Sequence, residues 1–170
     1  MAVKVKNPID EYLALPEGYP AELIGGEILL TPSPSYIHQK VAGTIFRKLA
    51  DYVEKKGLGE VLYEFDVHID DDNVVRPDIT FIFNENKIRE NWIEGVPDIV
   101  VEVLSSSTAT RELVDKRELY EKHGVKEYWV IDPENHVIYI FENINGIFQI
   151  YCKGNSCKSK ILEGFSINIE

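Results

Sequence analysis

Residues 97–104, with the sequence PDIVVEVL, constrain the fold more than any other stretch of the chain. Their β-branched residues favour a buried strand, yet the same stretch contains the carboxylates of Asp98 and Glu102. Side chains alternate between the two faces of a strand, so Asp98 and Glu102 share one face. Burying an unpaired carboxylate costs several kcal/mol, and each therefore needs a helix N-terminus, an arginine or a metal ion as its partner.

The segments on either side of this strand predict alternating helices and strands. Residues 35–56 have helical periodicity, with Ser33 or Ser35 as the N-cap and Gly57 as the terminator. Alternating apolar and polar side chains predict one strand over residues 60–69. The other expected elements are a strand over 74–83, an irregular or helical segment over 84–94, a helix over 109–123, and strands over 126–132, 136–143 and 146–151.

A helix, three strands, a helix and a strand, followed by hairpins, indicate an α/β fold with a mixed sheet flanked by helices. The length of 170 residues suits one domain with a full core. We expect a single domain over residues 1–170. It has an N-terminal hairpin at 20–32, a core at about 35–132 and C-terminal hairpins at 133–170.

Composition excludes several classes of protein. The net charge of −11 argues against indiscriminate coating of nucleic acid, because phosphate binding needs clustered cations. No apolar run approaches the roughly 18 residues of a membrane helix, and the N-terminus lacks a signal-peptide core, so we expect a cytoplasmic protein without membrane contact. Cys152 and Cys157 are too few for a structural zinc site, and we interpret them as free thiols, with a disulfide as the alternative.

A carboxylate on the neighbouring predicted strand gives Glu102 a candidate partner. If the strands over 74–83 and 97–104 pair, Asp78 and Glu102 converge. Two hard oxygen ligands near one point suit Mg²⁺ or Mn²⁺, with water and a substrate phosphate completing the octahedron. Asp98, at the start of its strand, is interpreted as a cap or turn residue.

These residues follow a known pattern. RPD at 76–78, followed by Glu102 on the next strand, resembles the PD-(D/E)XK nuclease superfamily, whose Asp and Glu-x-Lys lie on adjacent strands of an αβββαβ core. Five ordered blocks resemble the bacterial Uma-type restriction-endonuclease-like family: AELIGGE, SPSYIH, RPDITFI, GVPDIVVEVLSSST and KRELYEKHGVKEYWVIDP. The resemblance implies a restriction-endonuclease-like fold. It also implies a Mg²⁺- or Mn²⁺-dependent DNA endonuclease whose Asp78 and Glu102 hold the ion.

The motif places a lysine two residues after its glutamate, but this chain has Leu104 there. The resemblance implies that the lysine has migrated to the following helix, as Lys116. On a helical projection Lys116 lies within the apolar face, and Arg117 lies about as close on the other side. Lys116 is favoured because the pKa of an ammonium can be lowered for proton transfer, whereas an arginine stays charged.

Two more residues are candidate helpers of catalysis. His38 faces the apolar side of the helix over 35–56, where a core or capping histidine is the ordinary interpretation, but the SPSYIH block implies a role at the site. Glu22, or less strongly Glu27, matches the acid that an N-terminal element contributes in this superfamily. The Gly25–Gly26 pair between them is more simply a turn that needs positive φ.

The sequence leaves a second function open. The missing lysine at position 104 and the acidic charge also suit a non-catalytic module that binds nucleic acid or protein on a nuclease-like scaffold. Cleavage of both DNA strands needs two sites, so a homodimer formed through the late hairpins is expected. The first long helix has a local positive excess that is a candidate for contact with DNA phosphates, with an ordinary surface helix of mixed charge as the alternative. Its basic residues are Lys40, Arg47, Lys48, Lys55 and Lys56, against Asp51 and Glu54.

Overall fold

The computed structural model describes residues 7–105 and 109–169, with the backbone alone for residues 109–113. Its main sheet has six strands in the order β11-β10-β9-β8-β6-β3. Neighbours β3, β6 and β8 pair antiparallel, and β8 pairs β9 in parallel. The strands are β3 (Glu60–Tyr63), β6 (Ile79–Ile82), β8 (Ile99–Val103), β9 (Glu127–Asp132), β10 (Val137–Ile144) and β11 (Ile147–Gly154).

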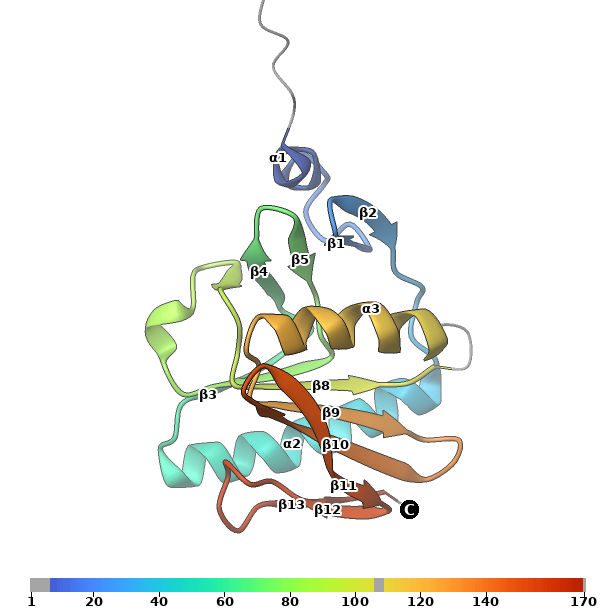
Figure 1. The fold of residues 1–170 in the computed structure, drawn as a ribbon, viewed down its shortest axis with the longest axis vertical. Coiled ribbons are helices and arrows are strands. Elements are labelled where there is room, and N and C mark those ends of the chain that lie inside the picture. The colour runs from blue at the N-terminus through green and yellow to red at the C-terminus, as the bar shows by residue number, and fades with distance from the viewer. Residues whose placement is uncertain (1–6, 106–108, 170) are drawn as a thin grey trace, which may run out of the picture.

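Helices α2 (Tyr36–Lys56) and α3 (Ala109–Lys122) cover opposite faces of this sheet (Figure 1). Ile45 and Leu49 of α2 pack with Val101 and Trp129, whereas Leu119 and Tyr120 of α3 belong to the core on the other face. The chain order α2, β3, β6, β8, α3, β9 is the αβββαβ order that the sequence predicts. The predicted fold, a mixed sheet flanked by helices, is therefore confirmed.

The ends of α2 follow directly from its sequence. The Ser35 hydroxyl accepts a hydrogen bond from the backbone N–H of His38 at 3.2 Å, and Gly57 ends the helix with a φ of 59°. The cap satisfies one N–H of the first turn that the helix leaves without a partner. This cap fixes the position of His38, which lies on the buried face of the first turn.

The predicted strands over 60–69 and 74–83 are wrong as continuous elements, because each one is broken. The first divides into β3 and β4 (Asp66–Asp70), and the second into β5 (Asn73–Val75) and β6. Glu64 takes a φ of 46°, which no strand residue adopts, and Pro77 has no N–H to offer to a ladder. The Glu64 N–H donates to the Asp78 carbonyl at 3.0 Å, so both breaks lie side by side.

The broken halves form a second sheet in the order β2-β1-β5-β4-β7. It contains the N-terminal hairpin of β1 (Ala21–Ile24) and β2 (Glu27–Leu30), and β7 (Trp92–Glu94) at its other edge. Leu23 of β1 pairs with Val74 of β5. The break therefore brings the N-terminal hairpin against the main sheet. The remaining elements are α1 (Pro8–Leu13), η1 (Glu85–Lys87), β12 (Ser156–Lys158) and β13 (Ser166–Asn168).

The interpretation of Cys152 and Cys157 as free thiols is wrong, because the two form a disulfide. The chain reverses between β11 and β12 and brings the two Cα atoms to 5.9 Å, within the range that a disulfide needs. No helix within the described residues is long and apolar enough to cross a membrane. The cytoplasmic location stays a prediction.

Candidate active site

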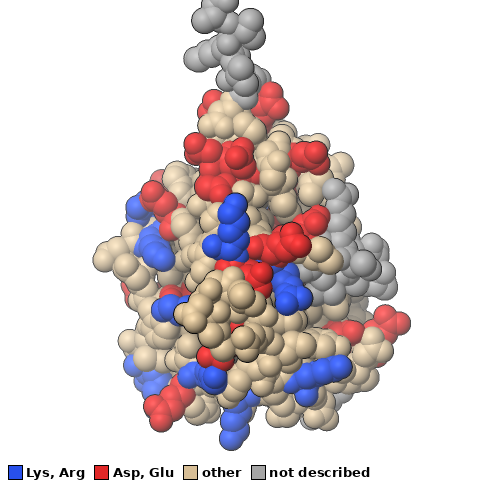
Figure 2. Space-filling model, viewed as in Figure 1, with Lys and Arg blue, Asp and Glu red and all other residues tan. Residues whose placement is uncertain are grey.

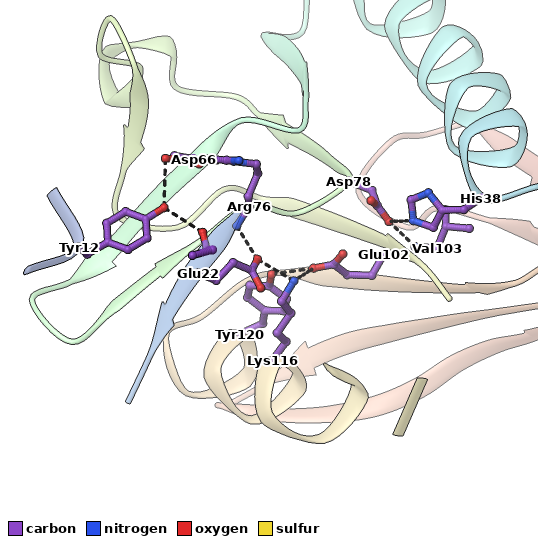
Figure 3. Close-up of polar contacts among 11 residues, drawn as sticks. Tyr12, Glu22, His38, Asp66, Arg76, Asp78, Glu102, Val103, Lys116 and Tyr120 are labelled. Carbon is purple, nitrogen blue, oxygen red and sulfur yellow. Dashed lines mark hydrogen bonds and ion pairs between the residues drawn. The ribbon is translucent and has the colours of Figure 1, made fainter. Parts of the chain in front are cut away.

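A cavity of about 260 Å³ lies where the two sheets meet, beside the N-terminus of α2. It is lined by residues from five different parts of the fold: Glu22 of β1, His38 of α2, Asp78 immediately before β6, Glu102 of β8 and Lys116 of α3. Figure 3 shows these side chains pointing toward one another. All five site residues predicted from the sequence thus lie at one cavity.

The pairing of β6 with β8 brings the two predicted metal ligands together. Thr80 pairs with Val100 and Ile79 with Val101, so the same register places Asp78 opposite Glu102. The backbone N–H of Val103 donates to Asp78 Oδ2 at 2.7 Å, which fixes this carboxylate at the end of the strand. Nε2 of His38 lies 3.1 Å from the same oxygen. His38 is therefore a partner of Asp78 and not an ordinary core histidine.

Lys116 joins the acids on the other side of the cavity. Its Nζ lies 2.8 Å from Glu22 Oε1 and 3.1 Å from Glu102 Oε1, and the lysine is only 4% exposed. The backbone N–H of Arg76 also donates to Glu22 Oε1, at 2.7 Å. The neighbouring Arg117 instead stacks over the Phe141 ring, 4.8 Å from its centroid. The structure thus brings Lys116 to the cavity and leaves Arg117 outside it.

Several acidic side chains lie close together in the cavity, and the pKa values of Glu102 and His38 are shifted there. Burial raises the pKa of Glu102 to about 8; the positive charge of Lys116 opposes this shift, and the carboxylates of Asp78 and Glu22 add to it. Burial disfavours the charged form of His38, but its hydrogen bond with Asp78 and the surrounding carboxylates outweigh this and raise its pKa. At neutral pH Glu102 is therefore mostly protonated, and the crowded acids of the cavity favour the binding of a proton or of another cation.

The donors present fit a hard divalent cation that keeps much of its water. No group of three or more His, Cys, Asp or Glu side chains among the described residues is arranged as a ready-made metal site. Asp78 Oδ1 and Glu102 Oε2 accept no hydrogen bond from the described part of the chain, since the contacts of both residues use the other oxygen. Two open carboxylate oxygens suit Mg²⁺ or Mn²⁺, which take few protein ligands, better than a closed zinc site.

Sequence reasoning missed two contacts that shape the cavity. Tyr120 donates its hydroxyl to Glu102 Oε1 at 3.0 Å; its spacing of four residues from Lys116 places both side chains on one helix face but does not by itself predict the contact with Glu102. Arg76 Nε lies 2.6 Å from Asp66 Oδ1. Nothing in the sequence pairs Arg76 with Asp66, because the contact depends on the breaks in both strands.

Two other acids stay outside the cavity. Glu27 lies exposed on β2. Asp98 accepts the Phe83 N–H at 2.8 Å and forms an ion pair with Lys126 at 2.7 Å. Asp98 is therefore the turn and strand-end residue that the sequence predicts.

Comparisons with known proteins identify the fold and the family of the chain. No curated protein matches the chain. A solved structure described as a "putative nuclease belonging to DUF820 from Anabaena variabilis ATCC 29413" has a TM-score of 0.73 and 24% sequence identity, over 91% of this chain and 89% of that chain. This likeness shows a shared fold. The family model Uma2, described as "Putative restriction endonuclease", matches residues 9–170, so the resemblance found in the sequence is confirmed and the chain belongs to the Uma2 family.

Proposed function

We propose that the protein is a metal-dependent endonuclease that hydrolyses phosphodiester bonds, with DNA as its substrate. The observation that carries this proposal is the convergence of Asp78, Glu102 and Lys116 on one cavity. Two descriptions support this reaction class: "Putative restriction endonuclease" for the Uma2 family and "putative nuclease" for the solved structure.

Each residue has a separate task in this proposal. Asp78 and Glu102 would hold Mg²⁺ or Mn²⁺ through their open oxygens. The ion, when bound, supplies an activated water and stabilises the charge that develops on phosphorus. Lys116 orients the attacking water or stabilises the pentavalent phosphate, because its ammonium is fixed by Glu22 and Glu102. His38 positions Asp78.

Cleavage of supercoiled plasmid DNA in Mn²⁺ or Mg²⁺ tests the proposal. We expect the wild type to nick the plasmid and the variants Asp78→Asn and Glu102→Gln to fail. Asp98→Asn is the matched control, since Asp98 lies on the same strand segment as Glu102 but outside the cavity. Absence of nicking by the wild type, or equal nicking by all four proteins, would contradict the proposal.

A non-catalytic binding module is the second candidate, and one observation favours it. Lys116 already bridges Glu22 and Glu102, so part of the acidic charge is neutralised without a metal. Isothermal titration with Mn²⁺ separates the two candidates. An enzyme binds the ion in the wild type and loses it in Asp78→Asn, whereas a binding module on this scaffold shows no binding that depends on Asp78.

The surface charge bears on how DNA would approach. Figure 2 shows acidic side chains gathered at the end of the molecule that carries α1 and the β4–β5 turn, where Asp10, Glu11, Asp71 and Asp72 are exposed. Lys40, Arg47, Lys48, Lys55 and Lys56 are exposed along α2, which begins at the cavity. We propose that α2, and not the acidic end, contacts the phosphates of the substrate.

We also propose that two copies associate through β11. This strand forms an edge of the main sheet, and Ile147 and Ile150 on it are 60% and 57% exposed. Exposed apolar edge strands are common sites of strand pairing between chains. Analytical ultracentrifugation should show a dimer that Ile150→Lys dissociates; a wild-type monomer at high concentration would contradict this.

A further inference from the structure

A second hollow lies directly beside the active-site cavity. This groove has a volume of about 620 Å³ and is bounded by the loop after α1, by β4 and by β7. It shares two wall residues, Glu64 and Arg76, with the cavity that holds Asp78 and Glu102. The two hollows therefore adjoin, and one ligand can occupy both.

The lining of the groove is unusually rich in flat rings. Its aromatic residues are Tyr12, Tyr19, Phe65, His68 and Trp92. The rings of His68 and Trp92 stack with their centroids 4.9 Å apart and their planes within 11°. Burial lowers the pKa of His68, which keeps its imidazole uncharged near neutral pH. Tyr19 is 39% exposed and Trp92 is half-buried, so both rings remain accessible to a ligand.

The charge of the groove decides which part of a nucleotide it accepts. Glu17, Glu64 and Asp66 line it against a single cation, Arg76. Asp66 is paired with Arg76 at 2.6 Å, and Glu64 Oε1 accepts a hydrogen bond from Gln39 Nε2 at 3.1 Å. Glu17 and the second oxygen of Glu64 are left as acceptors toward a ligand. Such a groove repels a phosphate but receives an uncharged ring whose amino groups donate to carboxylates.

We propose that this groove binds the base of an unpaired nucleotide next to the cleaved phosphate. The base stacks against the ring of Trp92, as bases stack on aromatic side chains in proteins that bind single strands. Its exocyclic amino group donates to Glu17 or Glu64, so cytosine and adenine are preferred over thymine. The inference rests on the proposed nuclease function. It adds that the substrate strand is unpaired, or flipped out, beside the site of cleavage.

The test uses the full chain carrying Asp78→Asn, which binds without cutting. Short single-stranded oligonucleotides are titrated while tryptophan fluorescence and the anisotropy of a labelled strand are recorded. Trp129, the other tryptophan, is fully buried, so quenching reports Trp92. We expect oligo(dC) to quench and oligo(dT) to bind more weakly. Trp92→Leu should weaken binding between about fivefold and about a hundredfold, and Trp92→Phe should retain most of it.

A second arm varies the ligand and needs no change in the groove. A strand in which one nucleotide beside the cleavage position is abasic should bind and be cut more weakly by the wild type. Equal binding of abasic and intact strands, or tighter binding of a lysine-rich peptide than of oligo(dC), would overturn the inference. The two proposals fail in different ways. Binding that depends on Trp92, without any cleavage, would contradict the nuclease function alone. Cleavage whose rate is unchanged by Trp92→Leu and by the missing base would contradict base binding in the groove alone.

Discussion

Glu127 on β9 and Glu102 on β8 are glutamates on neighbouring strands of the main sheet, but their surroundings differ. Glu127 is fully buried, and both of its oxygens are saturated by neutral donors. Oε1 accepts the backbone N–H groups of Lys160 at 2.7 Å and Ile161 at 3.1 Å. Oε2 accepts Trp129 Nε1 at 2.8 Å and the Ser159 hydroxyl at 2.9 Å. This carboxylate holds the C-terminal segment against the sheet.

Glu102 is satisfied only in part. Its Oε1 accepts hydrogen bonds from Lys116 and Tyr120, while Oε2 accepts none from the described residues and the side chain lines a cavity with Asp78 and Glu22. A structural carboxylate has its donors built in, whereas a carboxylate of a working site keeps capacity for a ligand. This difference is what we expect if Glu127 stabilises the fold and Glu102 serves the proposed catalytic site.

The largest expected effect concerns catalysis. Glu102→Gln should lower the rate of plasmid nicking by about a hundredfold to about a thousandfold, because the open oxygen and its charge are lost. Glu127→Gln changes the same atoms on the next strand and should leave the rate per folded molecule within about threefold of the wild type. Equal losses of nicking rate in the two variants would contradict the distinction between Glu102 and Glu127.

The next effect concerns the free energy of unfolding, which should change more on substitution of Glu127 than on substitution of Glu102. Glu127→Ala should lower the free energy of unfolding by about 3 kcal/mol, because two buried and two part-buried donors lose their acceptor. Glu102→Gln should change it by no more than about 1 kcal/mol, since Lys116 keeps Glu22 as a partner. Urea denaturation at pH 5 without divalent ions measures both, because the raised pKa of Glu102 leaves its side chain uncharged there, as glutamine is. A larger loss in Glu102→Gln than in Glu127→Ala would contradict the assignment.

The pH dependence of stability sharpens the picture of Glu102. Its pKa is raised from 4.5 to about 8, so the folded protein retains a proton that the unfolded chain releases. The free energy of unfolding should therefore fall as the pH rises from about 5 toward about 8. His38, whose pKa is raised from 6.5, adds a decrease of the same sign at higher pH, and His68, whose pKa burial lowers, adds an increase below about 6.5. Both histidines are unchanged in Glu102→Gln, so the difference between the wild type and this variant in the interval between pH 5 and 6 isolates Glu102.

Denaturant unfolding across that interval should show a more negative slope of this free energy against pH for the wild type than for Glu102→Gln. If the curve of Glu102→Gln has the same slope as that of the wild type, the proton is bound by another group.

The smallest effect is expected on α2, away from both glutamates. Lys40→Ala should weaken binding of DNA a few-fold and reduce the slope of log affinity against log salt by about one unit. Lys122→Ala, at the end of α3, is the control and should leave the slope unchanged. Fluorescence anisotropy at several salt concentrations measures this, and identical slopes for Lys40→Ala and the wild type would remove α2 from the DNA-binding surface.

Much of the site was predictable because it depends on local periodicity. Period-two alternation placed Glu102 on a defined face of β8, and the predicted pairing of the two strands, whose register only the structure gives, brings Asp78 opposite it. Helical spacing placed Lys116 on the inner face of α3, but the same spacing admitted Arg117. The choice between them came from the sheet packed beneath the helix, where Phe141 receives Arg117.

The sequence by itself determined the αβββαβ order of the core, the capped α2 and the convergence of Asp78 and Glu102 from neighbouring segments, because these follow from side-chain period and capping chemistry. The tertiary structure alone decided that Glu22 meets Lys116, that Asp66 meets Arg76 and that Cys152 bonds Cys157. Those contacts depend on two broken strands and on hairpins folding back in space. Local sequence patterns specify the face of a helix or strand on which each side chain lies, but not which distant element will pack against that face.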